Sequence, residues 1–259
     1  MTVKNTLKTR GIVLRTLDYS ESDRIVSFLT EEAGKITGMA KGARKSRKRF
    51  ANALEPFTCL SIVLTRMKDG KMAFIEETTI VDHYPGIRSD LEKSLAAAYL
   101  MDLTDQFNLE GKRLPDLFHL ISRFLSMLEK EKYTDNMVRF FELRFLRLTG
   151  YEPVLDRCSV CNTPLQSNLP YSFSPSAGGI RCLACHEHLR TTDGIPVSVG
   201  TIKTLLLGKN SEPALMNRIL MTEQCANECR RLLSRFIRYL LGKDLKSLNV
   251  LNDVRRMGL

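Results

Sequence analysis

Four cysteines stand in two closely spaced pairs in the second half of the chain. Two residues separate Cys158 from Cys161, two separate Cys182 from Cys185, and twenty residues lie between the pairs. This spacing lets both sulfurs of a pair face one ion, and four thiolates complete the tetrahedron that Zn²⁺ prefers. Four protein ligands leave no open position for a substrate. The spacing therefore predicts one structural zinc ion held by these four cysteines.

The surroundings of this cluster leave some alternatives open. His186 and His188 follow the last cysteine, and either is a possible ligand, although four available thiolates favour polar surface positions for both. Redox chemistry of the thioredoxin type needs a cysteine pair in a βαβ context, which the flanking sequence lacks. Cys225 and Cys229 continue an apolar helical stripe and are interpreted as core residues. Seven cysteines, an odd number with mixed spacing, do not resemble a disulfide framework, and this fits a reducing compartment.

A second group of residues has the chemistry to bind a polyanion. The nine residues from Lys41 to Arg49 include six Lys or Arg and no acid. Polyphosphate neutralises such a cluster and releases counterions, whereas the alternative is a solvated loop. Phe50 follows the loop, and base stacking and a buried anchor are equally good interpretations of its ring. The predicted DNA contacts are Lys35, Lys41, Arg44, Lys45, Arg47, Lys48, Arg49 and Phe50.

The composition narrows the class of partner. A net charge of +10 and a pI near 9.3 favour polyanionic partners. No apolar run approaches the roughly 20 residues needed to cross a bilayer, and no signal peptide is recognised, so we expect a cytoplasmic protein without a membrane partner. The chain contains no Walker-type loop, Rossmann glycine fingerprint, nucleophile elbow or zinc-protease helix. We therefore expect no catalytic residues and no enzyme activity.

The scaffold for these groups divides into a β-rich part and a helical part. Five short strands within about 75 residues, with no long helix between them, fit an OB-fold or an SH3-like barrel. The strands are expected at 11–14, 24–29, 35–40, 57–66 and 72–81.

Helical periodicity begins after Pro85-Gly86. The segment 152–195 is rich in Pro, Gly, Ser and Cys and is expected to be irregular. We therefore predict a multi-domain α+β protein, with an OB-fold nucleic-acid-binding domain at 1–82 and a helical domain at 83–259 that contains a zinc-binding insertion at about 152–195. Helices are expected to begin near Ser94 and to span 114–128, 136–148, 199–207 (ended by Gly208) and 223–241 (ended by Gly242).

The order of the N-terminal motifs resembles the RecO family of bacterial recombination mediators. The cysteine cluster also matches the zinc-bearing members of that family, and the resemblance covers most of the chain. The segments that carry it are Gly11-Ile12-Val13-Leu14, Tyr19-Ser20-Glu21-Ser22-Asp23-Arg24, Gly34-Lys35, Ala40-Lys41-Gly42-Ala43-Arg44, Leu54-Glu55-Pro56-Phe57 and Gly150-Tyr151-Glu152-Pro153.

This resemblance implies an N-terminal OB-fold, binding to single- and double-stranded DNA, and annealing of complementary strands without ATP. It also implies a location at the bacterial nucleoid, with RecR and the acidic tail of single-strand-binding protein as partners and RecA as an indirect one. Arg123, Arg139, Arg144 and Arg147 are candidate cations for that tail, within 114–148.

The residues alone do not reach annealing or RecA loading. They also fit a zinc-ribbon OB-fold protein that binds RNA or the transcription machinery, or a protein-interaction scaffold that happens to be basic. Arg231, Arg235 and Arg238 share one helical face, which is favoured as a solvated surface over an extension of the DNA footprint.

Overall fold

The computed structural model describes residues 6–46, 48–66, 72–107, 110–189, 193–211 and 219–256. The chain forms two compact units. The first contains residues 1–132 and 245–259, and the second contains residues 133–244. The predicted domains at 1–82 and 83–259 divide the chain differently, by separating strands from helices, and they stay a prediction.

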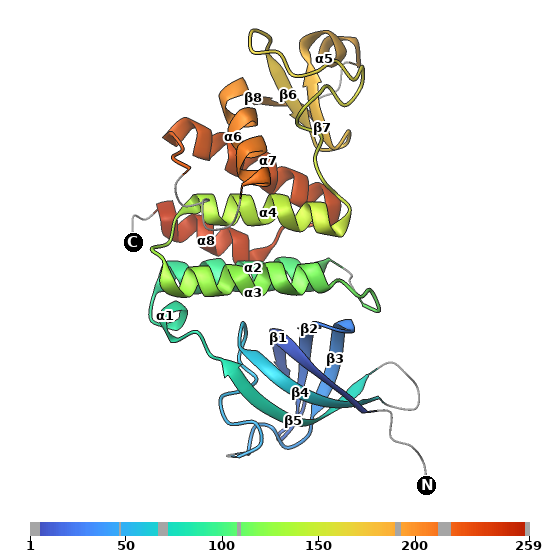
Figure 1. Ribbon diagram of the computed structural model, residues 1–259, viewed down its shortest axis with the longest axis vertical. Coiled ribbons are helices and arrows are strands. Elements are labelled where there is room, and N and C mark those ends of the chain that lie inside the picture. The colour runs from blue at the N-terminus through green and yellow to red at the C-terminus, as the bar shows by residue number, and fades with distance from the viewer. Residues whose placement is uncertain are drawn as a thin grey trace. The chain divides into compact units, whose positions relative to one another are not determined.

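Five strands of the first unit close into a barrel (Figure 1). Their order around the barrel is β1-β2-β3-β5-β4; β3 pairs with β5 in parallel, and the other neighbours are antiparallel. This is the five-stranded arrangement of an OB-fold, and each strand predicted from the sequence is confirmed. The strands are β1 (Thr6–Asp18), β2 (Arg24–Thr30), β3 (Gly34–Ala40), β4 (Cys59–Arg66) and β5 (Ala73–Asp82).

The barrel core is built from inward-facing apolar side chains of successive strands. Val26, Phe28 and Ile62 have no exposed surface. Side chains crowd the interior of such a small barrel, and Gly11 in β1 leaves room for those of the neighbouring strands. A Cβ atom there would lie 2.9 Å from the Cδ1 atom of Ile62. The core thus holds the strands, and therefore the loops at their ends, in fixed positions.

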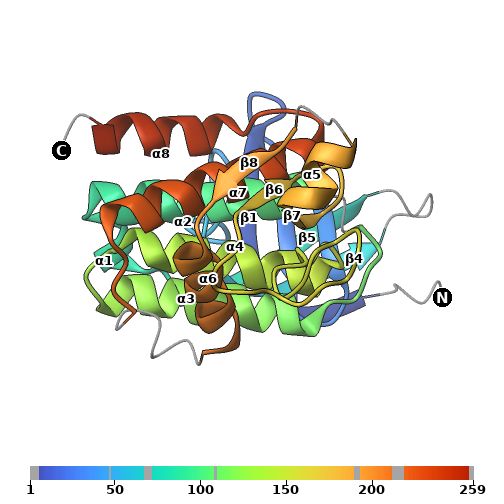
Figure 2. The same ribbon diagram turned by 90° about the horizontal axis from the view of Figure 1, so that it is seen from above.

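Helices complete the first unit, and the last of them comes from the far end of the chain. Figure 2 shows α8 running along α2, and the two helices pack together, with the Ser247 hydroxyl donating to Asp102. Helix α8 was not predicted from the sequence. These helices are α1 (Pro85–Arg88), α2 (Leu91–Gln106), α3 (Pro115–Lys130) and α8 (Lys246–Arg256).

The second unit contains helices and a small antiparallel sheet of order β7-β6-β8. The expectation that 152–195 is irregular was wrong, because two strands of this sheet, β6 and β7, and the helix α5 lie in it. Its strands are only three or four residues long, which is too short for a periodic sequence signal. The elements are α4 (Asp135–Thr149), β6 (Tyr171–Ser174), β7 (Gly179–Cys182), α5 (Leu183–Leu189), β8 (Ile195–Val197), α6 (Val199–Asn210) and α7 (Glu223–Leu241).

Gly208 was expected to end a helix, and this was wrong, because α6 continues through it to Asn210. The residue is buried, and a Cβ atom on it would lie 1.9 Å from the Cε1 atom of Phe140 in α4. Glycine is therefore needed here for the close packing of two helices. By contrast, Gly242 follows the last residue of α7 with a φ of 68°, the left-handed conformation typical of a helix C-cap.

We expect Gly208→Ala to destabilise the second unit by about 1–3 kcal/mol, because the added methyl group overpacks the α4–α6 contact. Gly200→Ala, in the same helix, is the matched control. The nearest atom to a Cβ at Gly200 is the Ser198 Oγ, at 4.0 Å, so this change should stabilise the helix by about 0.5–1 kcal/mol. Thermal unfolding of both variants measures the difference, and equal midpoints would contradict this account.

Candidate nucleic-acid interface and metal centre

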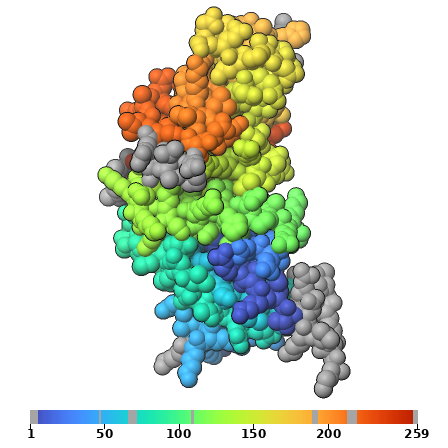
Figure 3. Space-filling model, viewed as in Figure 1, coloured from blue at the N-terminus to red at the C-terminus, as the bar shows by residue number. Residues whose placement is uncertain are grey.

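The segment 41–49, called the basic loop below, leaves the barrel at the end of β3. In the space-filling view, the light-blue atoms after β3 project at the lower edge of the barrel (Figure 3). Arg47 lies outside the described residues. The structure thus brings most of the predicted DNA contacts onto one exposed feature. The loop side chains that are exposed to solvent are those of Lys41, Arg44, Lys45, Lys48 and Arg49.

The basic loop is folded into turns and fixed to the barrel. The Lys45 N–H donates to the Gly42 carbonyl at 3.2 Å, and the Ser46 Oγ accepts from the backbone N–H of Arg49 at 3.1 Å. The side chain of Ala43 lies in the barrel core. The cations are therefore presented on an ordered surface, which lowers the entropy lost when they meet a ligand.

Acidic side chains pair with only some of the cations. The Asp18 carboxylate lies 3.0 Å from the Arg24 Nε and 3.6 Å from the Arg44 Nε. Within the described part of the chain, the side chains of Lys45 and Lys48 form no ion pair or hydrogen bond. These two lysines are therefore the cations most available to an external anion. Arg24 was not among the predicted contacts, because nothing in the sequence connects its charge with the loop.

Phe50 lies in the barrel core, with 4% of its surface exposed. The Arg49 guanidinium covers it, with 4.4 Å between the Cζ atom and the ring centroid. This placement favours the buried anchor over base stacking. Tyr19, which is 63% exposed in the turn beside the loop, presents an accessible ring instead.

Lys35 also differs from the loop cations. Its ammonium lies 2.9 Å from the Asp105 carboxylate and donates to the Asp105 carbonyl at 2.7 Å, and only 11% of its side chain is exposed. It stands at the start of β3, whereas the basic loop follows the end of that strand. The contacts of Lys35 are those of a structural ion pair between the barrel and α2.

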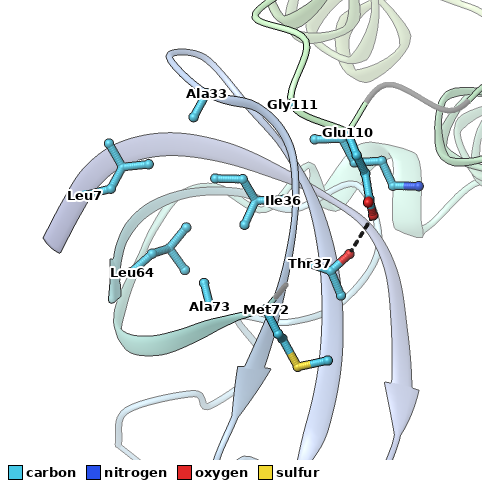
Figure 4. A pocket seen from close by; sticks show the side chains of 10 residues that line it. Leu7, Ala33, Ile36, Thr37, Leu64, Met72, Ala73, Glu110 and Gly111 are labelled. Carbon is cyan, nitrogen blue, oxygen red and sulfur yellow. Dashed lines mark hydrogen bonds between the residues drawn. The ribbon is translucent and has the colours of Figure 1, made fainter. Parts of the chain in front are cut away.

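A pocket lies beside Lys35 at this end of the barrel (Figure 4). Leu7, Ile36 and Leu64 supply apolar side chains to it, and the Thr37 Oγ1 lies 3.5 Å from the Glu110 carboxylate. Lys35 is the only cation in its lining among the described residues. A pocket lined mostly by apolar residues, with a single cation, does not match a polyanion. The basic loop therefore remains the better candidate interface for DNA.

The second unit gathers the four predicted metal ligands. Cys158 and Cys161 lie on a turn before β6, whereas Cys182 ends β7 and Cys185 lies in α5. Their sulfur atoms all lie within 4.8 Å of one another, and the sulfurs of Cys161 and Cys182 are 3.8 Å apart. Metal–sulfur bonds of about 2.3 Å give a tetrahedron with edges of about 3.8 Å. The four thiols thus have the spacing to hold one metal ion.

The local hydrogen bonds prepare this cluster for a cation. The hydroxyl and the backbone N–H of Thr163 lower the pKa of Cys161 to about 6. Burial and the neighbouring thiols raise the pKa of Cys185 to about 12. Crowding negative charge without a cation is unfavourable, and a bound divalent ion stabilises all four thiolates. The donor set therefore fits a thiophilic metal such as Zn²⁺.

The other candidate ligands have different roles. The imidazole of His186 lies with its Nδ1 3.2 Å from the Ser172 Oγ, and His188 is exposed. Among the described residues neither histidine belongs to the cluster of ligating atoms. Cys225 and Cys229 are buried on α7, as predicted for core residues.

The sequence also matches two family models that together span nearly the whole chain. "Recombination protein O N terminal" matches residues 1–84, and "Recombination protein O C terminal" matches residues 88–249. The chain belongs to the RecO family. RecO proteins are DNA repair and recombination proteins, which agrees with an OB-fold that presents a cationic loop.

Full-length relatives of this chain carry the name of the same family. A DNA repair protein RecO from Syntrophus aciditrophicus (strain SB) is 47% identical over 259 residues, which is all of both chains. The DNA repair protein RecO of Desulfatibacillum aliphaticivorans is 35% identical over 252 residues, covering 96% of this chain and 97% of the relative. In the described residues of this RecO protein, none of the helices has the length and apolar character to cross a membrane.

Proposed function

We propose that this RecO protein is a recombination mediator that binds single- and double-stranded DNA through the basic loop. It anneals complementary strands and, together with RecR, promotes the loading of RecA onto DNA coated by single-strand-binding protein. The protein acts without catalytic residues of its own, in the bacterial cytoplasm at the nucleoid. The observation that carries this proposal is the ordered, exposed row of cations at the end of an OB-fold barrel.

The loop chemistry supports contacts to the phosphate backbone. Arg and Lys side chains neutralise phosphates and carry no base information, so such a surface binds many sequences alike. A mediator that anneals any complementary pair needs this lack of sequence preference. The exposed ring of Tyr19 offers a stacking surface for an unpaired base, a contact worth about 1–3 kcal/mol.

The four-cysteine site is proposed to bind one structural zinc ion. It would hold the turn before β6 against the end of β7 and the start of α5, and so stabilise the small sheet. No open coordination position is required for this role.

Contacts with the acidic tail of single-strand-binding protein are also part of the proposal. Of the candidate cations, Arg139 is fully buried and pairs with Glu142 at 2.8 Å, so it is not available to a tail. Arg123 and Arg147 are exposed and remain candidates.

Binding of labelled oligonucleotides, measured by fluorescence anisotropy at several salt concentrations, tests the proposed function. We expect single-stranded DNA of different sequences to bind with similar affinities that fall steeply with salt, and duplex DNA to bind as well. Preferential binding of RNA of the same sequence would instead favour the RNA-binding alternative, since only contacts to the 2′-hydroxyl distinguish the two strands. Salt-independent or absent binding would contradict the proposal and favour an interaction scaffold.

A further inference from the structure

The turn between β1 and β2 lies directly beside the basic loop and is hydrogen-bonded to it. The carboxylate of Asp23 accepts from the backbone N–H of Gly42 at 2.8 Å. Next to it, the Ser22 carbonyl accepts from the Arg44 N–H at 3.0 Å, and the Ser20 carbonyl accepts from the Arg44 guanidinium at 3.0 Å. The first turn of the basic loop is thus attached to a different loop of the barrel.

Asp23 is itself held in place. The Ser22 hydroxyl donates to its Oδ1 atom at 2.8 Å, and the Ser20 Oγ accepts from its backbone N–H at 3.1 Å. The hydrogen bond from the Gly42 N–H, followed by that from Ser22, lowers the pKa of Asp23, so the carboxylate stays ionised at neutral pH. Gly42 has a φ of 69°, and this left-handed conformation directs its N–H within the turn.

We propose that Asp23 is a positioning residue for DNA binding, because it fixes the first turn of the basic loop, from Lys41 to Arg44, before DNA arrives. This inference rests on the proposed DNA-binding function of the loop. The rest of the loop has its own attachments through Ser46 and the buried ring of Phe50. Loss of the Asp23 carboxylate therefore removes one anchor of the first turn, which keeps the hydrogen bonds of Arg44 and the buried side chain of Ala43, and it leaves the barrel core intact.

Charge alone and positioning predict opposite effects for this residue. Asp23 is an anion beside a surface that binds a polyanion, so its removal should strengthen DNA binding if only charge matters. If Asp23 orders the loop, its removal should weaken binding, because the ordering must then occur on binding. The sign of the change therefore decides between the two.

The chain provides a matched set of variants for this test. Asp23→Ala removes both the charge and the acceptor, whereas Asp23→Asn removes the charge and keeps an oxygen that accepts from the Gly42 N–H. Asp23→Glu keeps the charge and moves the carboxylate away by one methylene group. Glu21→Ala removes an exposed acid from the same turn.

Single-stranded DNA affinity is measured for the full-length variants at one salt concentration. We expect about tenfold weaker binding by Asp23→Ala, the size that corresponds to ordering about one residue on binding, and weaker binding by Asp23→Glu. Asp23→Asn and Glu21→Ala should bind as tightly as the unaltered protein or more tightly. Tight binding by both Asp23→Ala and Asp23→Glu would overturn the inference. If Asp23→Ala does not fold, the comparison of Asp23→Glu with Asp23→Asn tests the inference, and equally tight binding by these two variants would overturn it.

Hydrogen exchange of the same variants separates this inference from the proposed function. In Asp23→Ala, the amides of Gly42 and Arg44 should exchange faster, while those of β2 and β3 stay protected. Unchanged exchange at Gly42 would overturn the positioning role. If exchange accelerates but a variant lacking the loop cations binds DNA normally, the proposed DNA site is wrong and the structural contact stands.

Discussion

Replacing Cys158 with serine is expected to remove the bound zinc and to lower the unfolding free energy of the second unit by at least about 4 kcal/mol. Thiolate ligation and folding are coupled, because the unfolded chain does not present four sulfurs within 4.8 Å of one another. The small sheet also packs on the helices of its unit. The rings of Phe173 in β6 and Phe236 in α7 are in edge-to-face contact, with centroids 5.3 Å apart.

Metal analysis and thermal unfolding of Cys158→Ser measure these effects. Cys225→Ser is the matched control, because Cys225 is a buried cysteine of the same unit outside the cluster. It should retain one zinc per chain even if its stability falls slightly. Absence of zinc from the unaltered protein, prepared without a chelator, would contradict the proposed metal site.

Neutralising the basic loop is expected to weaken single-stranded DNA binding about 100-fold near 0.15 M salt if about four of its cations contact phosphates. The barrel should remain folded, because the exchanged side chains are exposed wherever the structure describes them. Annealing of complementary strands should fall in parallel, since both strands must be neutralised. The variant combines alanine substitutions of Arg44, Lys45, Arg47, Lys48 and Arg49.

Two further variants sharpen this prediction. Lys45→Ala with Lys48→Ala removes the cations without partners among the described residues and should weaken binding about tenfold. Arg231, Arg235 and Arg238 are exposed on α7, and their joint replacement by alanine removes three charges elsewhere. We expect little change from that control. A large loss with the α7 control and none with the loop variant would move the DNA site to the second unit.

The elements that were predicted correctly are those whose sequence signal lies within the element itself. The strands are short runs rich in apolar and β-branched residues between turn residues, and all five were recognised. Helix α7 was predicted with its observed bounds because an apolar stripe ends at a glycine. The cysteine cluster was also predictable, since paired spacing alone brings two sulfurs together. In contrast, α8 is short and polar, and its role as a partner of α2 comes from tertiary packing.

Side-chain environments depended on contacts that the sequence does not show. The partner of Lys35, Asp105, is 70 residues away along the chain, so the ion pair could not be read from the motif around Lys35. Phe50 and Arg49 are neighbours, but only the fold buries the first and exposes the second. The hydrogen bond between Asp23 and Gly42 likewise depends on two loops that the barrel brings together.

The most direct test of DNA binding through the basic loop is the salt dependence of single-stranded DNA affinity. If about four loop cations contact phosphates, these contacts alone contribute a slope near −3 in log affinity against log salt, at about −0.7 per contact. The five-alanine loop variant should lose most of this slope and should lose affinity about equally for all sequences. A folded loop variant that keeps both the affinity and the slope of the unaltered protein would contradict DNA binding through the basic loop.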